Sequence, residues 1–184
     1  MKKILLLITV ICLMIAGSTS AQESSFNQND NVVSLGIGLG GTFYHGWYSG
    51  YSGISRLPTF TLAYERCIIG ELFNEQSAIG IGGIGGFNYS SYSNTWTSTN
   101  ILVGLRPTFH YAFIDNLDTY AGGMLGYNIH STKWKDGTTT HIGSSGFAYG
   151  VFAGARYYFA GSLAVYAEFG YGYTFLNAGI SLKF

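Results

Sequence analysis

The sequence predicts an all-β fold, an eight-stranded antiparallel up-and-down transmembrane β-barrel, and three observations lead to that prediction. Apolar residues alternate with small or polar residues in eight separate segments, the period of a strand with one apolar side. Charged residues make up only 10% of the chain, well below the proportion usual in soluble globular proteins. The last segment, TFLNAGISLKF, keeps the alternation up to a terminal Phe184.

The first residues have the pattern of a secretory signal peptide. MKKILLLITVICLMIAGSTSA joins a basic pair to an apolar core and a small-residue cleavage site. The apolar run is too short to cross a membrane as a helix. We therefore expect a signal peptide at residues 1–21 and a single barrel domain at residues 22–184. Loss of Lys2 and Lys3 leaves 7 basic and 9 acidic residues, with no basic patch for nucleic acid.

The first four strand segments lie in the N-terminal half. Residues 31–41, NVVSLGIGLGG, alternate Val, Leu and Ile with Ser and Gly. Residues 57–67 alternate Phe, Leu and Tyr with Thr, Ala and Glu, and residues 77–89 set Ile, Phe and Tyr among glycines. Residues 100–113 alternate branched and aromatic side chains with Gly, Arg, Thr and His. Each segment therefore predicts a strand with one apolar face.

The last four segments continue the pattern. Residues 117–130 place Leu, Tyr and Ile on one side, and residues 147–159 set Tyr, Val, Ala and Phe against Gly and Arg. Residues 163–170 alternate Leu, Val, Ala and Phe with Tyr and Glu, and residues 174–184 complete the set. An even number of strands is what a closed antiparallel barrel needs.

The connections alternate in length, as they do in a transmembrane barrel with short turns on one side and long loops on the other. Tight turns are expected at Asp115-Asn116 and Gly161-Ser162. The connection at residues 69–77 is long for the short-turn side. The long connections, rich in Ser, Thr, Gly, Tyr and Trp, are residues 42–57, 90–99 and 131–146.

The composition of the second face of these strands indicates whether the apolar side chains point into the barrel or out of it. A soluble barrel points its apolar face inward and covers its exterior with charge. Here the second face is Gly, Ser, Thr and Asn with few ions, which suits the filling of a narrow lumen. We therefore expect the apolar side chains to face lipid, with the ring closed so that no strand edge lies unpaired in hydrocarbon.

The chain resembles the small eight-stranded outer-membrane β-barrel proteins of the OmpX and OmpA-barrel type. The resemblance runs from about residue 31 onward and is most specific in GARYYFAGSLAVYAEFGYGYTFLNAGISLKF, residues 154–184. It implies export to the outer membrane of a Gram-negative bacterium. In such families the barrel-assembly machinery reads the last strand, and Ile180, Leu182 and Phe184 match that signal.

The charged residues of the strands are expected to line the lumen. A basic side chain facing lipid near the midplane would cost about 2–4 kcal/mol, and a charge inside a narrow lumen needs a partner. We expect one ionic network that fills the barrel, with a direct Arg156–Glu168 contact, and a proton or ion path is the alternative. Its expected members are Glu65, Arg106, His110, Arg156, Glu168 and Lys183.

Two motifs could indicate a cofactor or a reaction. GIGGIG at residues 80–85 matches GxGxxG, but a dinucleotide site needs a helix after it, and FNYSSYSNTW follows. His130 and Ser131 could serve a lipid A-modifying enzyme, but neighbouring strand residues point to opposite faces. We therefore expect no enzyme, no cofactor and no metal. His45, His141 and Asp136 lie in the loops, and the lone Cys67 is expected to be a buried apolar residue.

Aromatic residues divide into two groups by position. One group suits the interfacial girdle of a membrane protein, and it comprises Tyr64, Tyr111, Tyr157 and Phe159. The other group lies in the long loops, where it could contact lipopolysaccharide sugars or a surface ligand, and it comprises Tyr44, Trp47, Tyr48, Tyr51, Tyr92, Trp96 and Trp134.

The sequence therefore favours a structural or surface-interaction role in the outer membrane, such as envelope integrity, adhesion or stress resistance. The expected partners are outer-membrane lipid, lipopolysaccharide, the barrel-assembly machinery and a loop ligand. A lipid A-modifying enzyme and a narrow passive pore are the alternatives.

Overall fold

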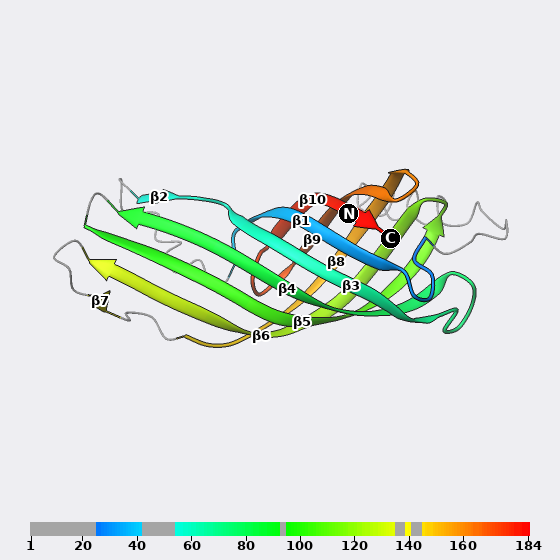
Figure 1. Cartoon of the computed structure of the whole chain (residues 1–184), viewed down its shortest axis with the longest axis horizontal. Helices are drawn as coiled ribbons and strands as arrows, with labels where there is room; N and C mark the ends of the chain where they lie inside the picture. Colours follow the sequence, from blue (N-terminus) through cyan, green and yellow to red (C-terminus); the bar gives the residue numbers. More distant parts are fainter. Residues whose placement is uncertain (1–24, 42–53, 93–94, 135–138, 141–144) are drawn as a thin grey trace, which may run out of the picture.

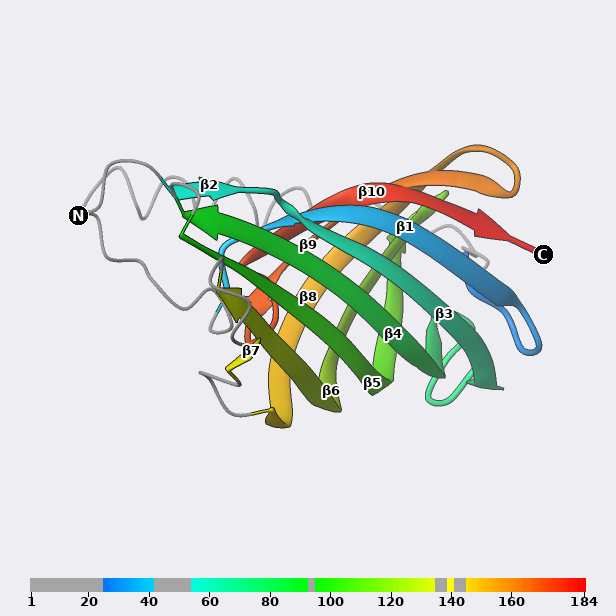
Figure 2. The ribbon, with the colours of Figure 1, turned by 60° about the vertical axis from the view of Figure 1, so that its left-hand side comes forward.

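A computed structural model describes residues 25–41, 54–92, 95–134, 139–140 and 145–184. Eight strands form a closed antiparallel ring in which each strand pairs with the next and β10 returns to β1 (Figures 1 and 2). This confirms the predicted all-β, up-and-down barrel. The eight strands are β1 (Asn31–Leu39), β3 (Thr59–Gly70), β4 (Ser77–Tyr92), β5 (Trp96–Ile114), β6 (Leu117–Trp134), β8 (Gly146–Ala160), β9 (Leu163–Tyr171) and β10 (Leu176–Lys183).

Two short strands extend the sheet outside the ring. β2 (Ile54–Arg56) pairs with the end of β4, and β7 (Thr139–Thr140) pairs with the end of β6. Both lie at the end of the barrel where the long hairpins are, which we call the loop end. The opposite end, where Asn31 and Phe184 exchange backbone hydrogen bonds of 3.0 and 2.9 Å, is the terminal end. Among the described residues no helix is long and apolar enough to cross a membrane.

The strands differ greatly in length, and the barrel is therefore taller on one side. β1 and β9 have 9 residues and β10 has 8, whereas β5 has 19 and β6 has 18. A transmembrane strand needs about 9–11 residues, so the hairpins of β4, β5 and β6 project beyond the short strands at the loop end (Figure 2). These strands run past their expected ends because Ser and Thr continue the ladder after the apolar alternation has stopped.

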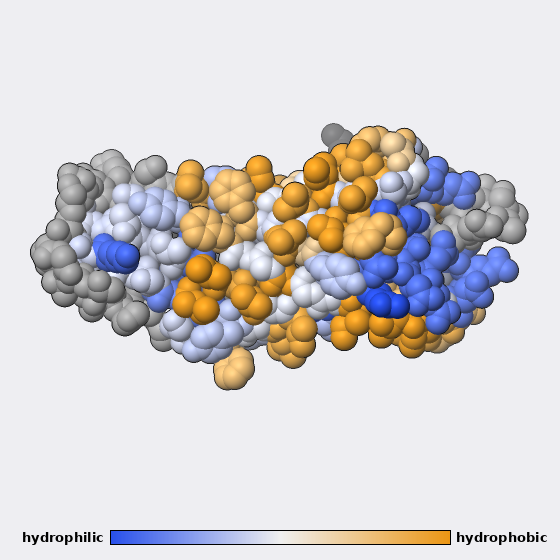
Figure 3. Space-filling view, viewed as in Figure 1, coloured by the Kyte–Doolittle hydropathy of each residue, from blue (hydrophilic) through white to orange (hydrophobic). Residues whose placement is uncertain are grey.

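The outer surface carries the apolar side chains, as the sequence predicts. Leu105, Leu125 and Val151 are 64%, 71% and 64% exposed, although each lies in the middle of a strand. Hydrophobic residues gather over the middle of the barrel, and hydrophilic residues gather at the terminal end (Figure 3). Buried polar residues such as Ser34 and Asn177 lie on the opposite faces of the strands, so the barrel is apolar outside and polar inside.

The lumen also holds an apolar layer that the sequence does not predict. Tyr173 enters it from the β9–β10 connection, where Gly172 has a φ of +125°. Gly86 on β4 leaves room for the Tyr173 ring, because a Cβ at that position would collide with it. The layer comprises Ile84, Leu102, Met124, Ala148 and Tyr173, with Ala63 and Phe152 packed against it.

The long connection between β3 and β4 is an ordered turn. The Ser77 hydroxyl accepts hydrogen bonds from the backbone N–H groups of Phe73 (2.9 Å) and Asn74 (3.2 Å). Gln76 accepts a hydrogen bond from the Tyr111 hydroxyl at 2.8 Å and, through its carbonyl, from the Ala112 N–H at 2.9 Å. The turn thus rests on the end of β5, and this explains its length on the side where turns are short.

Candidate functional site

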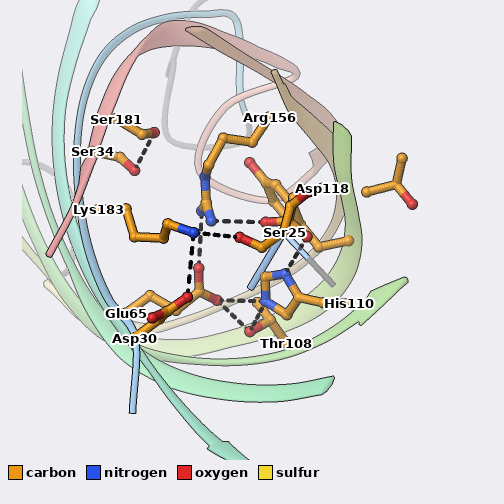
Figure 4. Close-up of polar contacts among 12 residues, drawn as sticks. Ser25, Asp30, Ser34, Glu65, Thr108, His110, Asp118, Arg156, Ser181 and Lys183 are labelled. Atoms are coloured by element: carbon orange, nitrogen blue, oxygen red, sulfur yellow. Dashed lines mark hydrogen bonds and ion pairs between the residues drawn. The ribbon is translucent and has the colours of Figure 1, made fainter. Parts of the chain in front are cut away.

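The half of the lumen nearer the terminal end contains a charge cluster built from four strands, which we call the His110 cluster (Figure 4). Arg156 on β8 donates from Nη1 to Asp118 Oδ2 and from Nη2 to Glu65 Oε2, each at 2.9 Å. His110 on β5 lies between the same two carboxylates, with Nδ1 2.8 Å from Asp118 Oδ1 and Nε2 3.1 Å from Glu65 Oε1. The Thr108 hydroxyl donates to Glu65. All five residues are buried.

The geometry of His110 indicates its charge. Both ring nitrogens face carboxylate oxygens, and an imidazole donates from both nitrogens only when it is doubly protonated. A protonated His110 and Arg156 together balance Glu65 and Asp118. The cluster is then electrically neutral, which a group of charges surrounded by protein requires.

A second group, the Arg106 cluster, lies toward the loop end. Arg106 Nη2 on β5 donates to Glu168 Oε1 on β9 at 2.6 Å, and the guanidinium carbon lies 4.0 Å from the centre of the Phe152 ring. Glu168 also accepts hydrogen bonds from the Tyr120 hydroxyl at 2.9 Å and from Asn177 Nδ2 at 3.4 Å. One guanidinium and one carboxylate therefore neutralise each other, and both carboxylate oxygens accept hydrogen bonds.

Tyr120 joins the two clusters. Its ring lies 4.9 Å from the Arg156 guanidinium carbon and 5.3 Å from the His110 ring centre, and its hydroxyl binds Glu168. Two small cavities border these residues, one of about 10 Å³ between the clusters and one of about 30 Å³ above Arg106. Such cavities hold about one or two water molecules. Side chains therefore fill the lumen around the two clusters.

Five of the six expected network residues lie in the lumen, but they form two clusters and not the single ionic network that was expected, and the sixth lies apart from both. Lys183 lies at the terminal end, where Nζ is 3.5 Å from Asp30 Oδ2 and donates to the Ser25 carbonyl at 3.0 Å. It also lies 5.0 Å from the centre of the Tyr158 ring. Its side chain is 23% exposed, so Lys183 lies at the mouth of the barrel and does not belong to either cluster.

The predicted direct contact between Arg156 and Glu168 is wrong. Arg156 reaches across the lumen to Glu65 and sideways to Asp118, and Glu168 pairs with Arg106. The strand register explains the difference, because Arg156 is opposite Tyr166 and Glu168 is opposite Gly154. The two residues are therefore diagonal neighbours, and each has a better-placed partner on another strand.

Asp118 is the residue of the cluster that the sequence analysis missed. It is 2% exposed and contacts both Arg156 and His110. The signal was present, because Asp118 has the same strand parity as Tyr120 and His130, whose side chains also point into the lumen.

One arrangement within the His110 cluster has the order of a nucleophile triad. The Thr108 hydroxyl is 3.0 Å from His110 Nε2, and His110 Nδ1 contacts Asp118. In a hydrolase the hydroxyl would donate to the imidazole and face a substrate pocket. Here the hydroxyl donates to Glu65, and Thr108 is 4% exposed. This arrangement therefore favours a structural role for these residues over a catalytic one.

Other sequence motifs occupy positions that do not form a reaction centre. His130 is buried, with Nδ1 2.7 Å from Asn100 Oδ1 and Nε2 3.0 Å from Thr132 Oγ1. Ser131 follows on the opposite face of β6. The GIGGIG segment lies within β4, which continues as a strand to Tyr92. No group of His, Cys, Asp or Glu that could hold a metal ion occurs in the described residues.

The terminal residues and the girdle aromatics point outward. Ile180 and Leu182 are 52% and 48% exposed on the lipid-facing side of β10, and Phe184, the residue after β10, is 67% exposed. Tyr157 and Phe159 are 48% and 55% exposed. Of the loop residues singled out in the sequence, His45, His141, Asp136, Tyr44, Trp47, Tyr48 and Tyr51 lie outside the described residues.

Comparison with solved structures identifies the same fold. The chain is similar to Ail, the attachment invasion locus protein of Yersinia pestis, with 11% identity over 85% of this chain and 95% of that chain and a TM-score of 0.51. The complex of Ail with the heparin analogue sucrose octasulfate matches with 12% identity, the same coverage and a TM-score of 0.51. At this identity the likeness shows the fold alone. No family model and no curated protein sequence matches the chain.

The Arg106–Glu168 pair should show strong energetic coupling. Glu168→Gln or Arg106→Met alone leaves one buried charge without its counter-ion and should lower the free energy of unfolding by about 3 kcal/mol. The double variant should lose less than the sum of the two, because neither charge then remains. Urea unfolding in detergent micelles measures the cycle, with the part-exposed Lys183–Asp30 pair as the weakly coupled control. Additive losses would contradict the pairing.

Proposed function

We propose that this protein is a non-enzymatic β-barrel of the Gram-negative outer membrane with a structural or surface-interaction role. The observation that carries the proposal is the combination of an apolar outer wall with a lumen filled by neutralised charges. We place the terminal end in the periplasm and the long hairpins outside the cell, because outer-membrane barrels have short turns on the periplasmic side and long loops on the extracellular side.

A surface ligand would meet the hairpins of β4, β5 and β6. Trp96 and Trp134 are directly opposite each other near the tips of β5 and β6, and the exposed Lys133 lies at the same tip on the other face of β6. The loop-end segments of the sequence carry Arg56, Lys133 and Lys135 against a single acidic residue, Asp136. Aromatic rings with a positive charge suit an anionic glycan, such as lipopolysaccharide or a sulfated polysaccharide.

The two alternative functions have less support. A lipid A-modifying enzyme would need a reachable nucleophile and base, but the only hydroxyl–imidazole–carboxylate series among the described side chains is enclosed in the His110 cluster. A passive pore would need a continuous passage. The cavities of about 10 and 30 Å³ beside the clusters do not form one.

We also propose that Ile180, Leu182 and Phe184 form the signal for the barrel-assembly machinery. These side chains are exposed at the end of the chain, on and directly after β10, the strand that closes the ring against β1. Phe184→Ala should lower the yield of folded barrel in the membrane, measured as the band whose gel mobility changes on boiling in SDS. Phe73→Ala, at an 80% exposed phenylalanine in a turn at the same end, is the matched control. Equal yields from the two variants would contradict the proposal.

Binding of an anionic glycan tests the surface role. Lys133→Ala should weaken binding of the folded, detergent-solubilised protein to immobilised heparin and to lipopolysaccharide by about fivefold, because the exposed charge attracts the anionic ligand. Added salt should weaken wild-type binding in the same direction. Arg66→Ala removes an exposed basic residue at the terminal end and should have no effect. Binding unaffected by Lys133→Ala and by salt would contradict a loop-end glycan site.

A further inference from the structure

A short segment before the first strand folds back into the terminal end of the lumen. Phe26 is 0% exposed and forms a buried apolar group with Val32, Cys67 and Ala78. Its ring centre lies 4.3 Å from that of His110. Phe26 therefore covers the His110 cluster on the side that faces the mouth of the barrel.

The segment is attached to strands on both sides of the ring closure. Lys183 Nζ on β10 donates to the Ser25 carbonyl at 3.0 Å and lies 3.5 Å from the Asp30 carboxylate (Figure 4). On β3, the Cys67 carbonyl accepts a hydrogen bond from the Asn29 N–H at 3.2 Å, and the Cys67 N–H donates to the Asp30 carbonyl at 2.9 Å. These contacts hold the segment across the seam between β1 and β10.

The segment also has an ordered shape of its own. The Asn27 N–H donates to Asp30 Oδ2 at 2.9 Å, and the Asp30 N–H donates to the Asn27 carbonyl at 2.9 Å. Asn29 has a φ of +72°, a conformation that Asn tolerates better than most residues. A Cβ at Gly70 would lie 3.1 Å from the Gln28 nitrogen, so the turn lies close against the end of β3.

From these contacts we propose that residues 25–30 are a built plug, with Phe26 as its stopper, that seals the terminal mouth of the lumen and locks the β1–β10 seam. The plug keeps water away from the buried carboxylates and from His110. That the sealed mouth faces the periplasm rests on the proposed function, whereas the seal itself does not depend on it. The sequence does not predict the plug, because ESSFNQND has neither a strand pattern nor a helical one.

Cys67 reports directly on the seal. It is the only cysteine outside the expected signal peptide, and it lies beneath Phe26 with 0% exposure. In the folded wild type, its thiol should react slowly with a small cationic methanethiosulfonate. Phe26→Ala should raise the reaction rate by about tenfold or more, because the plug no longer closes the mouth. Phe73→Ala removes an exposed phenylalanine at the same end and should leave the rate unchanged.

The mobility of unboiled protein in SDS shows whether each variant is folded. If Phe26→Ala does not fold, Lys183→Met decides the question, because it removes the contacts with Ser25 and Asp30 and should raise the Cys67 rate by about threefold. A wild-type rate as fast as that of the urea-unfolded chain would overturn the proposal. A rate unchanged in every folded plug variant would overturn it equally.

Discussion

The hydrocarbon of a membrane offers no hydrogen-bond partner, and this constraint explains most of the structure. Every backbone polar group in the spanning region must bond within the protein, so the strands close into a ring and leave no free edge. The side chains that meet lipid must be apolar, and half of every strand is therefore unavailable to polar groups. All remaining polarity is directed into a lumen that has to neutralise its own charges.

The lumen meets that requirement in layers. Phe26 closes the terminal mouth, and the neutral His110 cluster lies above it. Tyr120 connects this cluster to the Arg106–Glu168 pair, and an apolar layer around Met124 follows toward the loop end. A barrel filled in this way is well suited to act as a rigid support for the hairpins that project from β4, β5 and β6.

Strand parity accounts for what could be predicted from the sequence. It identified the lipid-facing and lumen-facing sides and placed Glu65, Arg106 and Glu168 inside. It could also have found Asp118. The ion-pair partners could not be predicted, because an inward Arg in a narrow lumen reaches several strands. Arg156 forms an ion pair with Glu65 across the barrel and not with its diagonal neighbour Glu168. The position of Phe26 could not be predicted either, because all of its partners except Val32 come from β3, β4 and β5, far along the chain.

The central claim is that side chains fill the lumen from the plug to the apolar layer. Electrical recording from the purified, folded protein in a planar lipid bilayer tests this claim most directly. A filled lumen predicts that insertion of the protein leaves the bilayer without resolvable single-channel steps at moderate voltage. Stable conductance steps that recur with each insertion would contradict the account, because ions would then have a continuous path past Arg106 and His110.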